Sequence, residues 1–231
     1  MNSKYLLSGI AALSMLCSCS DDFLEPEALS FYEPGTVFTT ESGLKAAMAV
    51  SDRHLRMIIT DGDDSYPKWG TELMFSDMML WGKTDEGSGI RDDMANKLTP
   101  TTIESEISYL WSEAWTGIKY ANTILSYVDL VNIPQEEKDQ YRAQAYFHRA
   151  LRYYNLVFEF GDIPLVTKII SKPKTDYKSC PKEEILDMLA HDLEFAVKHC
   201  PSQSEMDTYG SPNKEACRML LAKVYLAIGK Y

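Results

Sequence analysis

Apolar residues recur every three or four positions over most of the second half of the chain. The clearest run extends from residue 107 to residue 128, where these side chains form one continuous stripe on a long helix. The Asn-Ile-Pro sequence at 132–134 ends that helix, and the acids that follow favour the first turn of a second helix, which ends at Gly161. Pro164 excludes helix beyond that point, so residues 162–166 are predicted to be extended.

The same periodicity predicts three further helices. Thr40 can cap one that extends to Ile59. Another has Pro181 at its first helical position and is ended by Pro201, and the last one stops at Gly229. Two antiparallel helix pairs in succession indicate a mainly α fold built from stacked helical repeats, with long irregular loops.

Residues 60–104 lack this periodicity and are rich in turn residues. Aromatic rings can stack on the C–H faces of a sugar, while carboxylates and guanidinium groups bind its hydroxyls. Long irregular segments in compact domains are often functional. We therefore predict that the ligand-binding residues are Tyr66, Trp69, Asp77, Trp81 and Arg91. The alternative is that the two tryptophans only fasten this segment to the helices.

Aromatic side chains are also frequent on the helix that ends at Gly161, but there they follow helical spacing. Such a stripe predicts packing in the core. The residues concerned are Tyr146, Phe147, Tyr153, Tyr154 and Phe158. On the same helix, Arg149 and Arg152 are expected to pair with glutamate or to cap loop carbonyls, and His148 is expected to be a scaffold residue.

The N-terminus has the pattern of an exported protein. Residues 5–16 are apolar or small, a length typical of a signal peptide and too short for a membrane span. The sequence Leu-Cys-Ser-Cys that follows resembles a lipobox, and a metal clip or a Cys17–Cys19 disulfide explains it less well. We predict a signal peptide over 1–18, lipidation of Cys19, a tether over 19–37 and a helical domain over 38–231.

The composition and net charge of the chain limit the classes of molecule that it can bind. The hydrophobic share of 45% and the aromatic share of 11% indicate a globular chain. The formal charge of −11 disfavours nucleic acid as a partner. It also gives no attraction to anionic lipid, so attachment to a membrane must come from acyl chains.

No motif in the sequence indicates catalysis or a cofactor. The four histidines are scattered, and no zinc-protease, serine-hydrolase or phosphate-loop pattern occurs. Asp61, Asp63, Ser65 and Glu72 have the spacing of an EF-hand calcium loop, but the sixth position, which needs glycine, is a tyrosine. We predict neither an enzyme nor a calcium site.

Three cysteines lie far from the N-terminus: Cys180, Cys200 and Cys217. Cys200 and Cys217 flank a predicted connection between two helices, so one alternative is a disulfide between them. We favour the other interpretation, in which all three are small, mostly buried thiols.

Several stretches resemble one family. They are YLWSEAWTGIKYANTIL (109–125), AQAYFHRALRYYNLVFEFGDIPLV (143–166), EACRMLLAKVYLAIGKY (215–231) and CSDDFLEPE after the lipobox. Each is similar to SusD/RagB-type nutrient-uptake lipoproteins of the Bacteroidetes outer membrane. The resemblance is specific over 143–166 and vague over 60–104.

The resemblance implies a lipid-anchored protein of the outer membrane, facing the cell surface. In the family, tetratricopeptide-like helix pairs pack on a SusC-like TonB-dependent transporter, and the rest of the molecule binds the nutrient oligomer. Family members are roughly twice as long, a length of more than one ordinary domain. The chain is therefore expected to be the N-terminal part, from a truncated gene or as a fragment.

We expect a lipoprotein that binds nutrient oligomers, glycans above all, and delivers them to this transporter. One alternative is a lipid-anchored glycan hydrolase using an acid such as Asp77 or Asp85. The other is a helical-repeat adaptor that binds only proteins.

Overall fold

The chain divides into two compact units, residues 1–37 and residues 38–231. The computed structural model describes residues 34–59, 105–170, 174–206 and 210–230. In the first unit the described part is α2 (Pro34–Val37), a single helical turn. All other elements belong to the second unit.

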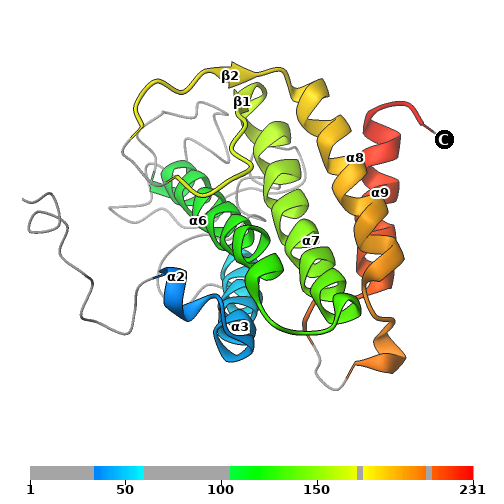
Figure 1. Ribbon diagram of the computed structural model, residues 1–231. Helices are drawn as coiled ribbons and strands as arrows, with labels where there is room; N and C mark the ends of the chain where they lie inside the picture. Colours follow the sequence, from blue (N-terminus) through cyan, green and yellow to red (C-terminus); the bar gives the residue numbers. More distant parts are fainter. Residues whose placement is uncertain (1–33, 60–104, 171–173, 207–209, 231) are drawn as a thin grey trace, which may run out of the picture. The chain divides into compact units, whose positions relative to one another are not determined.

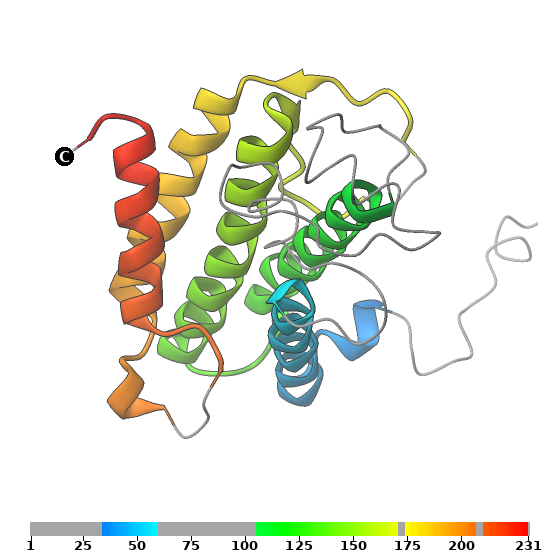
Figure 2. The same cartoon turned by 180° about the vertical axis from the view of Figure 1, so that it is seen from behind.

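The second unit is mainly helical, which confirms the predicted fold class (Figure 1). Its long described helices are α3 (Glu41–Ile59), α6 (Ser105–Tyr127), α7 (Gln135–Phe160), α8 (Lys182–His199) and α9 (Lys214–Ala227), with short 3-10 turns η3 (Val128–Leu130) and η4 (Gln203–Glu205). Helix α7 is central and contacts α3, α6, α8 and α9. Seen from behind, α6, α7, α8 and α9 again lie one beside the next (Figure 2). Successive antiparallel helices therefore form the predicted stack.

The extended chain predicted after α7 is present. Strand β1 (Ile163–Pro164) pairs antiparallel with β2 (Ser179–Cys180), so that Ile163 lies opposite Cys180. The connection between these strands leads from the end of α7 to the start of α8. We call it the β1–β2 connection, and it forms one wall of the pocket described below.

Local sequence signals set most of the helix ends. The Thr40 hydroxyl accepts a hydrogen bond from the Gly43 backbone N–H at 3.1 Å, and the Asn213 side chain accepts one from Ala216 N–H at 2.8 Å. Gly161 follows α7 with φ of +74°, a conformation that favours glycine. Pro181 was predicted to be the first helical residue of α8. It instead precedes the helix, in an extended conformation with ψ of 138°.

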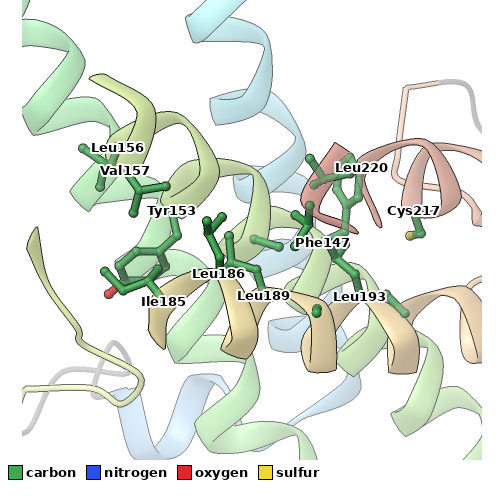
Figure 3. Close-up of a cluster of buried hydrophobic side chains, with 14 of the residues drawn as sticks. Phe147, Tyr153, Leu156, Val157, Ile185, Leu186, Leu189, Leu193, Cys217 and Leu220 are labelled. Carbon is green, nitrogen blue, oxygen red and sulfur yellow. The ribbon is translucent and has the colours of Figure 1, made fainter. Parts of the chain in front are cut away.

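The main hydrophobic core lies between α6, α7, α8 and α9. Figure 3 shows side chains of α7 and α8 facing one another, with α9 closing one side. Its labelled members are Phe147, Tyr153, Leu156, Val157, Ile185, Leu186, Leu189, Leu193, Cys217 and Leu220. A second, smaller core packs Leu44 and Met48 of α3 against the end of α6 and against η3 and α7. Both follow the apolar stripes of the sequence.

The packing prediction for the aromatic stripe of α7 holds for most of its residues. Phe147 and Tyr153 are buried, and Tyr146 and Tyr154 are half-buried against the core. Phe158 is the exception: it is 54% exposed, and its ring contacts that of Tyr154 in a tilted arrangement with 4.6 Å between ring centroids. Its neighbour Val157 is buried, so Phe158 lies on an outer face of the helix that its spacing from the other aromatic residues did not reveal.

None of the helices in the described ranges has the length and apolarity needed to cross a membrane.

Candidate functional site

The residues predicted to bind ligand lie outside the part of the chain that the structure describes. This holds for Tyr66, Trp69, Asp77, Trp81 and Arg91, for the lipidation site Cys19, and for Asp61, Asp63, Ser65 and Glu72 of the calcium-like spacing. Those predictions stay predictions. The candidate site described here is built from other residues.

An aromatic pocket lies between α6 and the β1–β2 connection. Its volume is about 420 Å³, within the range of small-molecule sites. Trp111 and Trp115 of α6 line one side, and Tyr177 lines the other together with Ile169 and Ile170. Tyr177, Ile169 and Ile170 are between 38% and 47% exposed. The pocket therefore offers apolar and aromatic faces at the protein surface.

The two tryptophans are held by their neighbours. Trp111 and Trp115 lie one helical turn apart, with ring centroids 5.5 Å apart in an edge-to-face arrangement. Trp111 also meets Phe160, and Trp115 meets Tyr153, again edge to face. The orientation of both indoles is thus fixed before any ligand arrives, which lowers the entropy cost of binding.

Lysines bring positive charge to the rim of the pocket. Lys119 of α6 and Lys168 of the β1–β2 connection line it. Lys174 places its ammonium group 5.3 Å from the ring centroid of Tyr177, a cation–π distance. Ammonium groups are hydrogen-bond donors, so the rim can bind hydroxyl oxygens.

The wall formed by the β1–β2 connection is fastened to the helices at Val166. The backbone N–H of Val166 donates to the Tyr153 hydroxyl at 2.7 Å, and its carbonyl accepts from Tyr153 at 3.0 Å and from the Asn122 amide at 2.9 Å. Burial raises the pKa of Tyr153 to about 12, so this phenol stays protonated near neutral pH. One wall of the pocket therefore moves with α6 and α7.

A buried ion pair between α7 and α8 also contacts the β1–β2 connection. Arg149 of α7 donates to both oxygens of Asp192 on α8, at 2.8 and 2.9 Å, and also to the carbonyl of Thr167 at 3.3 Å. The contact with Thr167 confirms that Arg149 donates to a loop carbonyl, whereas its acidic partner is an aspartate and not the expected glutamate. Burial raises the pKa of Asp192 to about 6 despite the opposing effect of Arg149. The carboxyl group is therefore ionised at neutral pH.

A second hollow, of about 1170 Å³, is bounded by α3, the start of α7 and the segment between α8 and α9. Most of its lining is charged or polar, including Lys45, Asp52, Glu136, Glu137, Lys198 and Lys214. A sugar site needs an apolar face as well as polar groups. The aromatic pocket is therefore the better candidate for a glycan.

Buried histidines connect α3 to α6 and α7. His148 Nε2 lies 2.8 Å from Asp52, and because a carboxylate accepts, the ring donates there. His54 Nδ1 accepts from Arg152 at 3.0 Å. The opposite nitrogen of His54 lies 2.7 Å from a carboxylate oxygen of Glu113, an ion-pair distance, although it makes no well-directed hydrogen bond within the described ranges.

Burial dominates the charge state of this cluster. It lowers the pKa of both His148 and His54, although Asp52 and Glu113 act in the opposite direction. It also lowers the pKa of Arg152 to about 10, which leaves the guanidinium charged at neutral pH. Both histidines are thus neutral, and they join helices rather than carry a charge, in agreement with the scaffold role predicted for His148.

The cluster contains a serine, a histidine and an aspartate, but in an order that does not activate a nucleophile. The Ser211 hydroxyl donates to Asp52, which also accepts from His148. A catalytic serine must instead bond to the histidine that removes its proton. This arrangement therefore joins the segment before α9 to α3 and α7.

The sequence contained only a weak signal for the aromatic pocket. Trp111 and Trp115 belong to the apolar stripe of α6, where spacing predicts core packing, and both are indeed half-buried. Ile169, Ile170 and Tyr177 occur in a lysine-rich extended segment. Apolar residues in a lysine-rich segment next to a strand end indicate an exposed apolar surface, and this pattern was the one sequence feature that pointed to the pocket.

Stacked antiparallel helices place the chain among the mainly α helical-repeat proteins. Residues 61–226 match the SusD-like family model described as starch-binding and associating with the outer membrane. The chain belongs to this SusD-like family, as its resemblance indicated. Members of the family are glycan-binding proteins and not enzymes.

Two relatives come from Formosa agariphila. SusD-like protein P2 is 30% identical over 237 residues, which cover 99% of this chain and 44% of the relative. SusD-like protein P25 is 23% identical over 218 residues, which cover 91% of this chain and 40% of the relative. The chain thus spans less than half the length of these relatives.

Solved structures share the fold. A SusD-like protein from Bacteroides fragilis superposes with a TM-score of 0.69 at 17% identity, covering 87% of this chain and 38% of that one. A laminarin-binding SusD-like protein superposes with a TM-score of 0.68 at 24% identity, and the match covers 83% of this chain and 41% of that protein. Surface glycan-binding protein A from Bacteroides fluxus superposes with a TM-score of 0.68 at 21% identity, and the match covers 81% of this chain and 40% of that protein.

Proposed function

We propose that the chain functions as a surface-exposed outer-membrane lipoprotein that binds glycan oligomers and delivers them to a TonB-dependent, SusC-like transporter. The observation that carries this proposal is the match of residues 61–226 to a family described as starch-binding and associating with the outer membrane. The names of two structural neighbours, one laminarin-binding and one a surface glycan-binding protein, support a glycan as the ligand class.

The binding step needs no covalent chemistry. A sugar ring would lie against Trp111 and Tyr177, whose faces exclude water from its C–H groups. Its hydroxyls would accept from the lysines at the rim. The segment over 60–104 would supply further contacts through Tyr66, Trp69, Asp77, Trp81 and Arg91. Handover to the transporter then requires only that the partner compete for the bound oligomer.

Anchoring and partner binding complete the proposal. Cleavage before Cys19 would leave a lipidated N-terminus, residues 19–37 would act as a tether, and residues 38–231 would form the helical domain. The helix pairs would face the transporter. Several acyl chains hold a protein to a membrane where one would not, so an acidic protein of this kind needs no attraction between its own charges and lipid.

Tyr177→Ala tests the aromatic pocket directly. Tyr177 is 40% exposed, so its loss should leave the fold intact. We expect binding of soluble starch or laminarin oligosaccharides to weaken about tenfold, the effect of losing roughly 1.4 kcal/mol of stacking and contact area. Isothermal titration calorimetry measures this change.

Phe158→Ala is the matched control, because Phe158 is also an exposed aromatic residue but lies outside the pocket. It should bind as the parent chain does. If both variants bind equally well, the pocket is not the glycan site, and the double variant Trp69→Ala, Trp81→Ala then tests the segment over 60–104. Absence of binding to every polysaccharide on a glycan array contradicts glycan binding by this chain.

A further inference from the structure

The thiols of Cys200 and Cys217 face each other inside the protein. Cys200 directly follows α8, and Cys217 lies in the first turn of α9. Their sulfur atoms are 3.5 Å apart, and their side chains are 1% and 0% exposed. Sulfur atoms at this distance are in contact without being bonded, since a disulfide bond measures about 2.05 Å.

The backbone holds both cysteines in place. The Cys200 backbone N–H donates to the carbonyl of Ala196 at 2.8 Å, and that of Cys217 donates to the carbonyl of Asn213 at 3.0 Å. The Lys214 N–H donates to the carbonyl of Pro201 at 2.9 Å and thereby draws the two ends of the connection together. The proximity of the sulfur atoms is therefore a property of the packed helix pair.

Side chains of the connection strengthen this arrangement. The Asn213 amide donates to the Gln203 side chain at 2.7 Å, and the Gln203 backbone N–H donates to Glu215 at 3.2 Å. Ser202 and Glu205 form a reciprocal capping box around η4. A connection organised in this way holds the first turn of α9 beside the end of α8 and keeps the two sulfur atoms in contact.

We propose that Cys200 and Cys217 form a disulfide that ties α8 to α9 in the exported protein. The thiolate of one cysteine attacks the disulfide of an oxidant, either a thiol-disulfide oxidoreductase or a small-molecule disulfide, and releases one of its thiols. The second cysteine then attacks the mixed disulfide and releases the other thiol. Two electrons pass to the oxidant, which leaves as two thiols and takes up the two protons.

The location of the family fits this chemistry. A protein associated with the outer membrane leaves the reducing cytoplasm, and disulfides persist outside it. The hydrogen bond to Cys200 and burial raise the pKa of the Cys217 thiol, so this thiol stays protonated in the folded protein. Once formed, the bond is shielded from reductants, because both cysteines are buried. In the structure Cys180, Cys200 and Cys217 are all unpaired, as the sequence led us to expect, and the proposed bond concerns the exported, oxidised protein.

Peptide mapping tests the bond. The chain is exported to an oxidising compartment or refolded with oxidised glutathione, alkylated in denaturant without reductant, and digested with trypsin. We expect the peptides 199–214 and 215–218 to be joined, and Cys180, whose thiol donates to Glu184 at 3.5 Å, to be alkylated. Alkylation of Cys200 and Cys217 after both treatments overturns the proposal.

Thermal unfolding supplies the second measurement and uses Cys180 as the matched position. We expect reductant to lower the unfolding midpoint of the parent chain and of Cys180→Ser by on the order of 5–10 °C. Reductant should leave the midpoint of Cys217→Ser unchanged. An equal effect of reductant on all three proteins contradicts the proposal. If Cys217→Ser does not fold, the peptide map of the parent chain still decides the matter.

Discussion

Single residues decide how α7 is held. His148, Arg149 and Arg152 occur within one helical turn and are all buried, although their types usually occur at the surface. Each has a partner on another helix: Asp52 on α3, Asp192 on α8 and His54 on α3. Buried polar groups cost free energy unless they are paired, so these contacts specify which helices pack on which face of α7.

The buried histidines predict a dependence of stability on pH. A histidine whose pKa is lower in the folded than in the unfolded state binds fewer protons when folded. Its contribution to stability is then complete above the unfolded pKa of 6.5 and is lost as the pH falls below it. Between pH 7.5 and pH 6, His148 alone should account for a loss of up to about 0.8 kcal/mol. Urea unfolding at both pH values measures this change in the free energy of unfolding.

His148→Gln should reduce this pH dependence, because the glutamine amide can donate to Asp52 but does not titrate in this range. His191→Gln is the control, since the His191 side chain is 81% exposed on α8. The measurement stops at pH 6 because Asp192 acts with the opposite sign around and below this pH, where it already offsets part of the histidine effect. Its raised pKa stabilises the protein at low pH, and that contribution is lost as the pH rises through about 6. Equal slopes for the parent and His148→Gln would exclude this role.

At the scale of the elements, the packing of α6 on α7 depends on a glycine, Gly117. Gly117 lies inside α6, where glycine normally costs about 1 kcal/mol relative to alanine. A Cβ atom placed on Gly117 would lie 2.5 Å from Nε of Arg152. Glycine is therefore needed there because it leaves room for the buried guanidinium stem where the two helices approach.

Gly117→Ala should consequently destabilise the protein, although the same change in an exposed helix interior is stabilising. Arg152 is 1% exposed and cannot move away freely, so we expect the free energy of unfolding to fall by about 1–3 kcal/mol. Chemical denaturation measures this loss. Ser112→Ala, at an exposed position of the same helix, should change stability little. A gain of stability in Gly117→Ala would show that the contact with Arg152 relaxes without cost.

At the scale of the whole molecule, the proposed function requires attachment to the outer membrane. Cys19→Ser removes the proposed acceptor of the lipid. We expect the variant to be found in the soluble fraction of the cell envelope, while the parent chain stays with the membrane and incorporates a labelled fatty acid. Cell fractionation and metabolic labelling measure the two effects.

The transporter partner is tested in the same preparations. An affinity tag on the parent chain should recover a large outer-membrane barrel protein, because the proposed delivery brings the two proteins into contact. Cys180→Ser serves as the control for Cys19→Ser, since it also removes a thiol but not the proposed anchor. Membrane retention of Cys19→Ser equal to that of the parent chain would contradict lipidation at this residue.

Much of the fold was predictable because helix formation here depends on nearby residues. The limits of α3 and α7 follow from Thr40, from the break at 132–134 and from Gly161, all of which act within a few positions. The lipobox resemblance and the family stretches are likewise local patterns. Helical periodicity also identified the buried faces, apart from Phe158, whose side chain is exposed.

The amino-acid sequence by itself thus determined the helices, their order and the family. Only the tertiary structure decided which side chains meet. The pocket of Trp111 and Tyr177, the pair of Arg149 and Asp192 and the facing thiols of Cys200 and Cys217 each join segments that are separate in sequence. The physical reason is that spacing along a helix fixes the face on which a residue lies, whereas the partner of that face depends on how the helices pack.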